Sequence, residues 1–208
     1  MSKFRRQLMA ASMGDPVPPL PYDAEVEYLE TTKNGDYTVP LGLMADEETD
    51  RIEIKFHVIT TDAQARFVSS NNDACRIYAN GSKVLSFHRA ASDQWAPHTS
   101  LSVGSNVTFV FDISWKDKTY TINGTTKTFS APNTPTVATE DTTLYRINSS
   151  EKVANGRLYY FKYWRNDVLI RDMIPVRVGS VGYMYDKVSG QLFGNSGTAS
   201  FTLGNDKN

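Results

Sequence analysis

Two acidic side chains near the start of the folded region have a spacing that could serve catalysis. Glu25 and Glu27 are two positions apart on an alternating segment. Hydrolysis of a glycosidic bond uses two carboxyl groups about 5 to 9 Å apart, and this is the separation typical of a strand's i and i+2 residues. The pair has no further acid in a Glu-x-Asp-x-x-Glu arrangement, and Asp112 is a lone acid in a strand-like segment. We therefore interpret these acids as solvent-facing and assign no catalytic residue.

The other chemistry-bearing residues are scattered along the chain. His57 and His88 fall in strand-like segments and His98 in a loop, which indicates neither a catalytic triad nor a zinc site. The cluster at 71–73 (Asn-Asn-Asp) is too short to indicate a calcium site. The single cysteine, Cys75, is expected to be a small buried hydrophobe. No Walker or dinucleotide-binding motif occurs, so we expect no enzymatic activity, no metal and no cofactor.

Aromatic side chains are the remaining chemical resource, with 3 Trp and 11 Tyr residues. A sugar-binding sandwich stacks an aromatic ring on the apolar face of a pyranose and uses flanking polar side chains to bind its hydroxyl groups. Trp95 fits this pattern best because it lies in a polar loop after a strand-like segment. The residues expected to surround a glycan there are Arg89, Asp93, Gln94 and His98. The alternative is that Trp95 covers the edge of the core.

Composition excludes several classes of protein. The 208 residues include 22 basic and 23 acidic side chains, and the net charge of −1 gives no global attraction to nucleic acid or to an anionic membrane. No apolar run approaches the roughly 18 residues that a membrane-spanning helix requires. We therefore expect a protein that binds neither nucleic acid nor membrane.

The first 22 residues differ in character from the rest. Residues 1–13 mix basic and apolar side chains without the continuous apolar core of a secretory signal. Residues 14–22 contain four prolines, which favour an extended spacer. We expect residues 1–22 to form an anchoring tail and linker, and residues 23–208 to form one domain. Segment 2–13 is either a frayed terminus or a docking peptide. The candidate docking residues are Phe4, Arg5, Arg6, Leu8 and Met9.

From residue 23 onward, short segments alternate between apolar and polar residues. In segment 51–58, Ile52, Ile54, Phe56 and Val58 are expected to face inward and the residues between them outward. In segment 24–30, Val26 and Tyr28 are expected to share one face. The other strand-like segments are 76–79, 84–88, 107–115, 119–122, 144–147, 157–164, 168–176 and 181–185. No later segment keeps a helical period, so the domain is predicted to be all-β.

Turn signals separate these segments. Asn-Gly pairs begin at residues 34, 80, 123 and 155, and segment 165–167 reads Arg-Asn-Asp. Asn and Gly tolerate the positive φ angles of the tight turns that join antiparallel strands, so several hairpins are predicted. Ten or more strands without crossover helices predict an antiparallel jelly-roll sandwich, because one amphipathic sheet must cover its apolar face with another.

The C-terminal third carries the most distinctive motifs, which are GRLYYFKYW at 156–164, LIRDMIPVR at 169–177 and VGYMYDKVSGQLFGNSGT at 181–198. They resemble the concanavalin A-like (laminin G-like) jelly-roll domains found in virion proteins of crAss-like and other tailed phages of gut Bacteroidales and in surface proteins of gut bacteria. Segment 26–30 is similar to the first strand of that family. The resemblance spans about residues 24–205 and is strongest over 156–204.

The resemblance implies a non-enzymatic, lectin-like function. We expect a bacteriophage virion structural protein, made in the bacterial host cytoplasm, that decorates the capsid surface or forms part of a fibre. Its tail would bind other virion proteins, and its jelly roll would bind cell-surface or mucin glycans. The alternatives are a bacterial carbohydrate-binding lectin domain outside a virion and, with less support, a glycoside hydrolase. An exposed sheet edge leaves a homo-oligomer open.

Overall fold

The protein is an all-β sandwich, seen in a computed structural model that describes residues 19–33, 35–46, 48–70, 75–88, 99–130, 137–146 and 152–207. Within these ranges the chain forms no helix, and hence none with the length and hydrophobicity that a membrane crossing needs. The larger sheet contains β1 (Ala24–Glu25), β2 (Leu29–Thr31), β4 (Asp50–Thr60), β8 (Ser105–Ser114), β9 (Thr119–Ile122), β10 (Thr125–Thr128), β13 (Asn155–Arg165), β14 (Val168–Val178), β15 (Val181–Asp186), β16 (Gln191–Phe193) and β17 (Thr202–Leu203). The smaller sheet contains β3 (Thr38–Pro40), β5 (Ala65–Ser69), β6 (Arg76–Ala79), β7 (Leu85–His88), β11 (Thr143–Tyr145) and β12 (Lys152–Val153).

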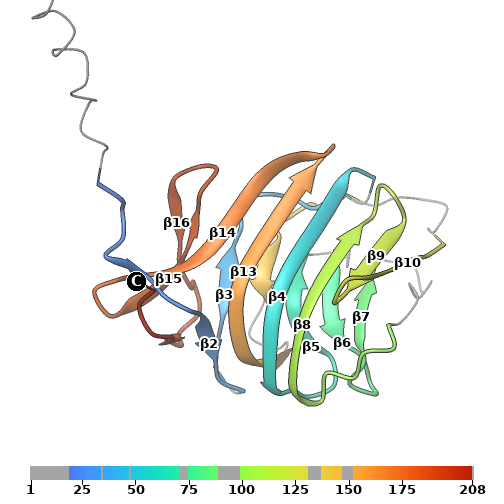
Figure 1. The fold of residues 1–208 in the computed structure, drawn as a ribbon, viewed down its shortest axis with the longest axis horizontal. Coiled ribbons are helices and arrows are strands. Elements are labelled where there is room, and N and C mark those ends of the chain that lie inside the picture. Colours follow the sequence, from blue (N-terminus) through green and yellow to red (C-terminus); the bar gives the residue numbers. More distant parts are fainter. Residues whose placement is uncertain are drawn as a thin grey trace, which may run out of the picture.

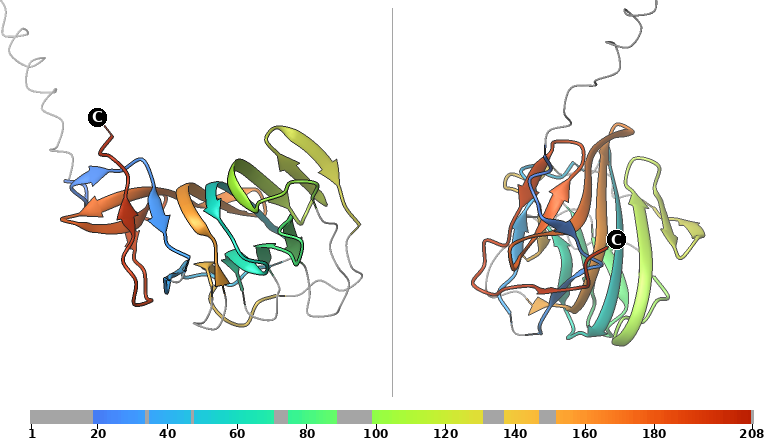
Figure 2. Two further views of the ribbon diagram at one scale, coloured as in Figure 1. Left: turned by 90° about the horizontal axis from the view of Figure 1, so that it is seen from below. Right: turned by 60° about the vertical axis from the view of Figure 1, so that its left-hand side comes forward.

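The two sheets are antiparallel apart from one short pair and pack face to face as two layers (Figures 1 and 2). The larger sheet has the order β10-β9-β8-β4-β13-β14-β15-β16, with β1 beside β14 and β2 between β13 and β17. The smaller sheet has the order β3-β11-β5-β6-β7, and β12 runs parallel to β5. The predicted all-β, two-sheet antiparallel sandwich is therefore confirmed.

Strand β4 shows most simply how the sequence produces this layering. It lies between β8 and β13 in the larger sheet. Ile52, Ile54, Phe56 and Val58 are buried, whereas the residues between them are half-exposed on the outer face. Successive side chains of a strand point to opposite faces, so this alternation commits one face of the sheet to the core and the other to solvent.

Aromatic rings from both sheets meet in the core. Phe56 of β4 lies edge-on to Phe67 of β5, with ring centroids 5.1 Å apart, and Phe67 lies edge-on to Phe109 of β8 at 5.4 Å. All three side chains are buried. Burying one such ring contributes roughly 1.5–3 kcal/mol relative to leaving it exposed, so ring packing between the layers is a main source of stability.

Three of the predicted turns form hairpins. Asn123 and Gly124 join β9 to β10, with φ angles of 47° and 84°. Asn166 and Asp167 join β13 to β14, with φ angles of 49° and 65°. The turn at Asn80 joins β6 to β7, and its side-chain Oδ1 accepts hydrogen bonds from the backbone of the turn. Asn34 lies outside the described residues.

The turn predicted at residues 155–156 is wrong, because both residues belong to strand β13. Gly156 is needed there for a close approach rather than for a turn. A Cβ atom at this position would lie 2.2 Å from the carbonyl oxygen of His57 on the neighbouring strand β4. Glycine within a strand marks such a close backbone approach, and the sequence pattern alone does not distinguish it from a turn.

The predicted strand at 24–30 also differs from the structure, because it is split into β1 and β2. Val26 is buried as predicted, but the next buried residue is Leu29. The break between the two strands changes the phase of the alternation, so Tyr28 is half-buried rather than part of the core. It belongs to the groove described below.

The predicted docking residues Phe4, Arg5, Arg6, Leu8 and Met9 lie outside the described residues. The chain enters the body at Tyr22, whose ring lies edge-on to Tyr185 of β15 with centroids 4.9 Å apart. The division at residues 22 and 23 into tail and body stays a prediction, as does the homo-oligomer.

Candidate functional site

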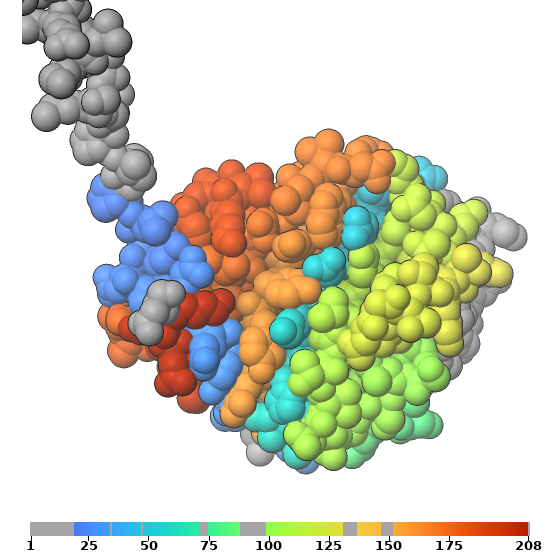
Figure 3. Space-filling view, viewed as in Figure 1, coloured from blue at the N-terminus to red at the C-terminus, as the bar shows by residue number. Residues whose placement is uncertain are grey.

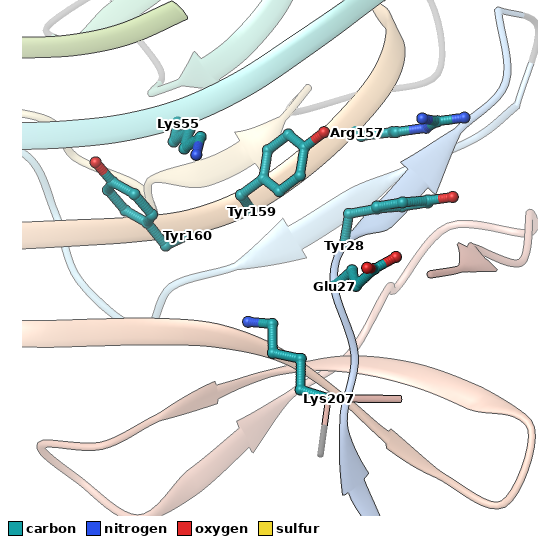
Figure 4. Close-up of a pocket in the computed structure, with 7 residues that line it drawn as sticks. All are labelled: Glu27, Tyr28, Lys55, Arg157, Tyr159, Tyr160 and Lys207. Atoms are coloured by element: carbon teal, nitrogen blue, oxygen red, sulfur yellow. The ribbon is translucent and has the colours of Figure 1, made fainter. Parts of the chain in front are cut away.

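A groove of about 500 Å³ lies on the outer face of the larger sheet, the face turned toward the viewer in Figure 3. It lies where β13 and β4 meet β2 and the C-terminal segment. Its lining residues are Glu27, Tyr28, Lys55, Arg157, Tyr159, Tyr160 and Lys207 (Figure 4). Three of the seven are tyrosines and three are cationic, so the groove combines flat apolar surfaces with positive charge.

A β-bulge in strand β13 creates the aromatic part of the groove. Leu158 pairs with Phe56 of β4 and Tyr160 pairs with Lys55, which leaves Tyr159 as an extra residue between them. Tyr159 and Tyr160 are therefore both half-buried on the outer face, although they are consecutive in the chain. A bulge inserts one residue into the alternation and re-aims the side chains around it. Two adjacent tyrosine rings consequently point away from the core.

A third ring and two cations pack around Tyr159. The ring of Tyr28 lies edge-on to Tyr159 with centroids 6.0 Å apart. The guanidinium of Arg157 lies 4.5 Å from the centroid of the Tyr28 ring, and the Lys55 ammonium lies 5.0 Å from that of Tyr159. A cation above an aromatic ring is attracted by its negative face. The rings are therefore fixed on one side by charged groups of the protein itself (Figure 4).

Tyr160 is positioned through its hydroxyl group. Burial raises the pKa of this phenol above its usual range, and a hydrogen bond to Glu53 and the negative charge of that carboxylate raise the pKa further. Tyr160 therefore stays protonated at neutral pH and donates its hydrogen to the Glu53 carboxylate. The ammonium of Lys162 lies 5.6 Å from the ring centroid on the same strand.

The charged groups of the groove differ in how far they are already neutralised. The Nε atom of Arg157 donates to Glu30 Oε2 at 2.7 Å, and this bond raises the pKa of the guanidinium. The carboxylate of Glu27 accepts a hydrogen bond from the side chain of Asn205 at 3.2 Å. In the described part of the chain, neither Lys55 nor Lys207 forms an ion pair. Their ammonium groups are the least neutralised charges in the groove.

The structure does not test the residues predicted from sequence to bind a glycan. Arg89, Asp93, Gln94, Trp95 and His98 all lie outside the described residues, so the loop at 89–98 stays a prediction. The ring of His57, on the outer face of β4, shares a hydrogen bond of 2.7 Å with Thr108.

Of the two acids considered for catalysis, one lines the groove. Glu27 lines the groove, whereas Glu25 is half-buried in β1 and its carboxylate accepts a hydrogen bond of 3.4 Å from Tyr22. The residues that the structure describes contain no group of three His, Cys, Asp or Glu side chains that could hold a metal ion. Cys75 is buried, as predicted.

Sequence reasoning treated segment 156–164 as architectural and did not single out its tyrosines. A signal was nevertheless present. Arg157 and Lys162 are both polar and are five positions apart, so a regular strand would point them to opposite faces. Both lie on the outer face, because the bulge at Tyr159 shifts the phase between them. The spacing of Arg157 and Lys162 is therefore consistent with the bulge between them.

Comparisons with known proteins support the fold class. No protein-family model and no curated protein sequence matches this chain. A solved structure from Bacteroides ovatus, named a "putative carbohydrate binding protein", superposes with a TM-score of 0.58 at 8% sequence identity. The match covers 86% of this chain but only 60% of that protein, so this chain spans about three fifths of its length. At this identity the likeness shows a shared β-sandwich fold alone.

Proposed function

We propose that the protein is a non-catalytic, lectin-like module of the concanavalin A-like type, and that the groove on its larger sheet binds carbohydrate. The observation that carries the proposal is the bulge that turns Tyr159 and Tyr160 to the same face beside Tyr28. Aromatic rings supply flat surfaces for the apolar face of a pyranose, and nearby polar groups hydrogen-bond the hydroxyl groups. The fold shared with a protein whose name refers to carbohydrate binding supports the same class.

The acids around the groove favour binding over hydrolysis. Glu27 is the one carboxylate that lines the groove in the described part of the chain, and Asn205 already binds it. Glu30 is bonded to Arg157, and Glu53 accepts the hydrogen of Tyr160. A glycosidase of the usual kind needs one carboxyl group to protonate the leaving oxygen and a second to act as nucleophile or base. These acids instead hold the groove's side chains in position.

The variant Tyr159→Ala tests the proposal. Its glycan binding is measured with the full chain, first on a glycan array and then by calorimetry. We expect the substitution to weaken binding at least about tenfold, because it removes one stacking surface. Tyr22→Ala is the matched control, since Tyr22 is also a half-buried tyrosine that packs on another tyrosine but does not line the groove. Binding that survives Tyr159→Ala and is lost in Trp95→Ala would assign the function to the 89–98 loop. Silence across the array would remove the carbohydrate proposal.

The place of the module on a phage particle, with residues 1–22 as its anchor, rests on the resemblance of the sequence and stays a prediction. Deletion of residues 2–13 is expected to leave the unfolding transition unchanged and to abolish incorporation into particles. Normal incorporation of the truncated protein would refute the anchor.

A further inference from the structure

The groove carries more positive charge than a neutral sugar requires. Lys55, Arg157 and Lys207 line it together with a single acid, Glu27. The protein as a whole has a net charge of −1, so this excess is local and does not follow from composition. A local positive potential on a nearly neutral protein selects an anionic ligand. We infer that the groove binds an anionic sugar chain, one whose units carry carboxylate or sulfate groups, and this inference rests on the proposed carbohydrate function.

The available hydrogen-bond donors agree with this ligand. Lys55 and Lys207 each present three N–H donors and, within the described ranges, share them with no carboxylate. Arg157 uses Nε on Glu30, and a guanidinium has five N–H donors in all. Among the described residues, the one carboxylate that lines the groove, Glu27, is bound to Asn205 and forms no ion pair with these cations. The two lysines are thus left to a ligand, whereas Arg157 is already paired with Glu30 and offers only its remaining N–H donors.

The arrangement of the cations suits a chain with repeated charges. Lys55 and Arg157 lie beside the rings of Tyr159 and Tyr28, and the Lys207 ammonium points toward the rings from across the groove (Figure 4). A sugar stacked on the tyrosines would therefore meet positive charge on more than one side. Three separated cations fit anionic groups on successive units better than they fit one compact anion.

The same combination of rings and cations occurs in proteins that bind single-stranded nucleic acid. The surroundings of the groove argue against that ligand here. On the outer face, Glu53 of β4 is bonded to Tyr160, and Asp112 of the following strand, β8, forms an ion pair with Arg51, so charges of both signs are present there. A nucleic-acid strand places a phosphate at every nucleotide and needs a continuous basic track. We therefore favour the anionic sugar and keep the oligonucleotide as an outcome of the test.

The test compares acidic glycans with their neutral counterparts on the full chain. The probes are oligogalacturonate and its carboxyl-reduced form, sialylated and desialylated mucin glycans, and sulfated and desulfated chondroitin oligosaccharides. We expect the protein to prefer the acidic member in at least one pair. The double variant Lys55→Gln plus Lys207→Gln should lose about tenfold in affinity for that member at low salt, because two exposed ion pairs are removed. Lys127→Gln, an exposed lysine of β10, is the matched control.

The outcomes separate this inference from the proposed function. Binding of neutral glycans that depends on Tyr159 but not on the two lysines would keep the proposed function and overturn the anionic ligand. An equal affinity for both members of every pair would do the same. Absence of any glycan binding would overturn both. Binding of oligothymidylate in preference to every acidic glycan would also overturn both. Weakening of the acidic complex between about 0.05 and 0.5 M salt supports the inference, since exposed charge pairs are screened.

Discussion

The larger sheet carries aromatic side chains on both of its faces, and the two sets have different neighbours. On the inner face the ring of Phe56 contacts Phe67 of the opposite sheet, with centroids 5.1 Å apart. On the outer face the ring of Tyr28 contacts the guanidinium of Arg157 at 4.5 Å, and that of Tyr159 contacts the Lys55 ammonium at 5.0 Å. Inner rings thus pack on other rings, whereas these outer rings pack on charged groups as well as on one another.

This difference separates stability from recognition. The inner rings are withdrawn from water on folding, so they contribute to the free energy of unfolding. The outer rings remain half-buried and have charged neighbours, Lys55 and Arg157. Because the outer set contributes little burial, its residues are free to serve a ligand. Substitutions on the two faces should therefore affect different measurements.

The largest expected effect comes from shifting the alternation of β13. Deletion of Phe161 removes a fully buried ring, and closing the bulge would then place the phenol of Tyr160 in its core position, so we expect a large loss of stability. Deletion of Tyr159 would instead restore the regular alternation, because Leu158 and Tyr160 already pair with adjacent residues of β4. Circular dichroism and urea unfolding check both variants. Equal destabilisation by the two deletions would contradict the bulge at Tyr159.

A smaller effect is expected from single truncations on the two faces. Phe56→Ala removes a fully buried ring and should lower the free energy of unfolding by about 3–5 kcal/mol. Tyr159→Ala removes a half-buried ring and should lower it by no more than about 1 kcal/mol. Urea unfolding followed by tryptophan fluorescence measures both. If Tyr159→Ala cost as much as Phe56→Ala, the outer ring would be part of the core.

The smallest effect concerns a buried phenol at alkaline pH. Burial raises the pKa of Tyr145 well above its usual value, because the ionised form would lie in the apolar core. The folded state therefore keeps Tyr145 neutral, while the unfolded chain ionises it above about pH 10. The stability is fully present below that pH and falls above it by about 1.4 kcal/mol per pH unit for this group.

Tyr145→Phe isolates this contribution. Its hydroxyl group has no hydrogen-bond partner among the described residues, so its removal at pH 7 should be neutral or slightly stabilising. Between pH 9 and pH 11 the variant should lose about 1.4 kcal/mol less than the unsubstituted protein. Tyr163, whose phenol pKa is also raised by burial, accounts for part of the remaining loss. Parallel pH profiles for variant and parent would contradict the assignment.

Patterns that depend on near neighbours in the chain were predictable. The alternation of β4 and the positive-φ turns at Asn123 and Asn166 follow from the preferences of a few adjacent residues. The prediction of a turn at Gly156 was wrong because glycine is required there by the close approach of the His57 carbonyl, about a hundred positions away in the chain. The change of face at Tyr28 likewise depends on how β2 pairs with β13. The residues next to a position in the chain do not show which distant strand will pair with it.

The groove illustrates the same limit. Its tyrosines, lysines and acid come from four parts of the chain, around residues 27–28, 55, 157–160 and 207. Taken alone, the sequence of each part predicts only the polar face of a strand or a chain terminus. Only the phase mismatch between Arg157 and Lys162 could have drawn attention to the bulge. The loop around Trp95 was the best site that local composition could suggest, and it stays a prediction.

By itself, the amino-acid sequence determined that the body is a β-sandwich, because a two-residue hydrophobic period leaves each strand with one face that must be covered. The tertiary structure alone decided which outer faces became neighbours. That choice depends on the pairing of strands distant in the chain and on one inserted residue in β13, and both are set by backbone hydrogen bonds between strands. The proposed binding surface thus follows from how the strands pair, whereas the core follows from the alternation of apolar and polar residues along each strand.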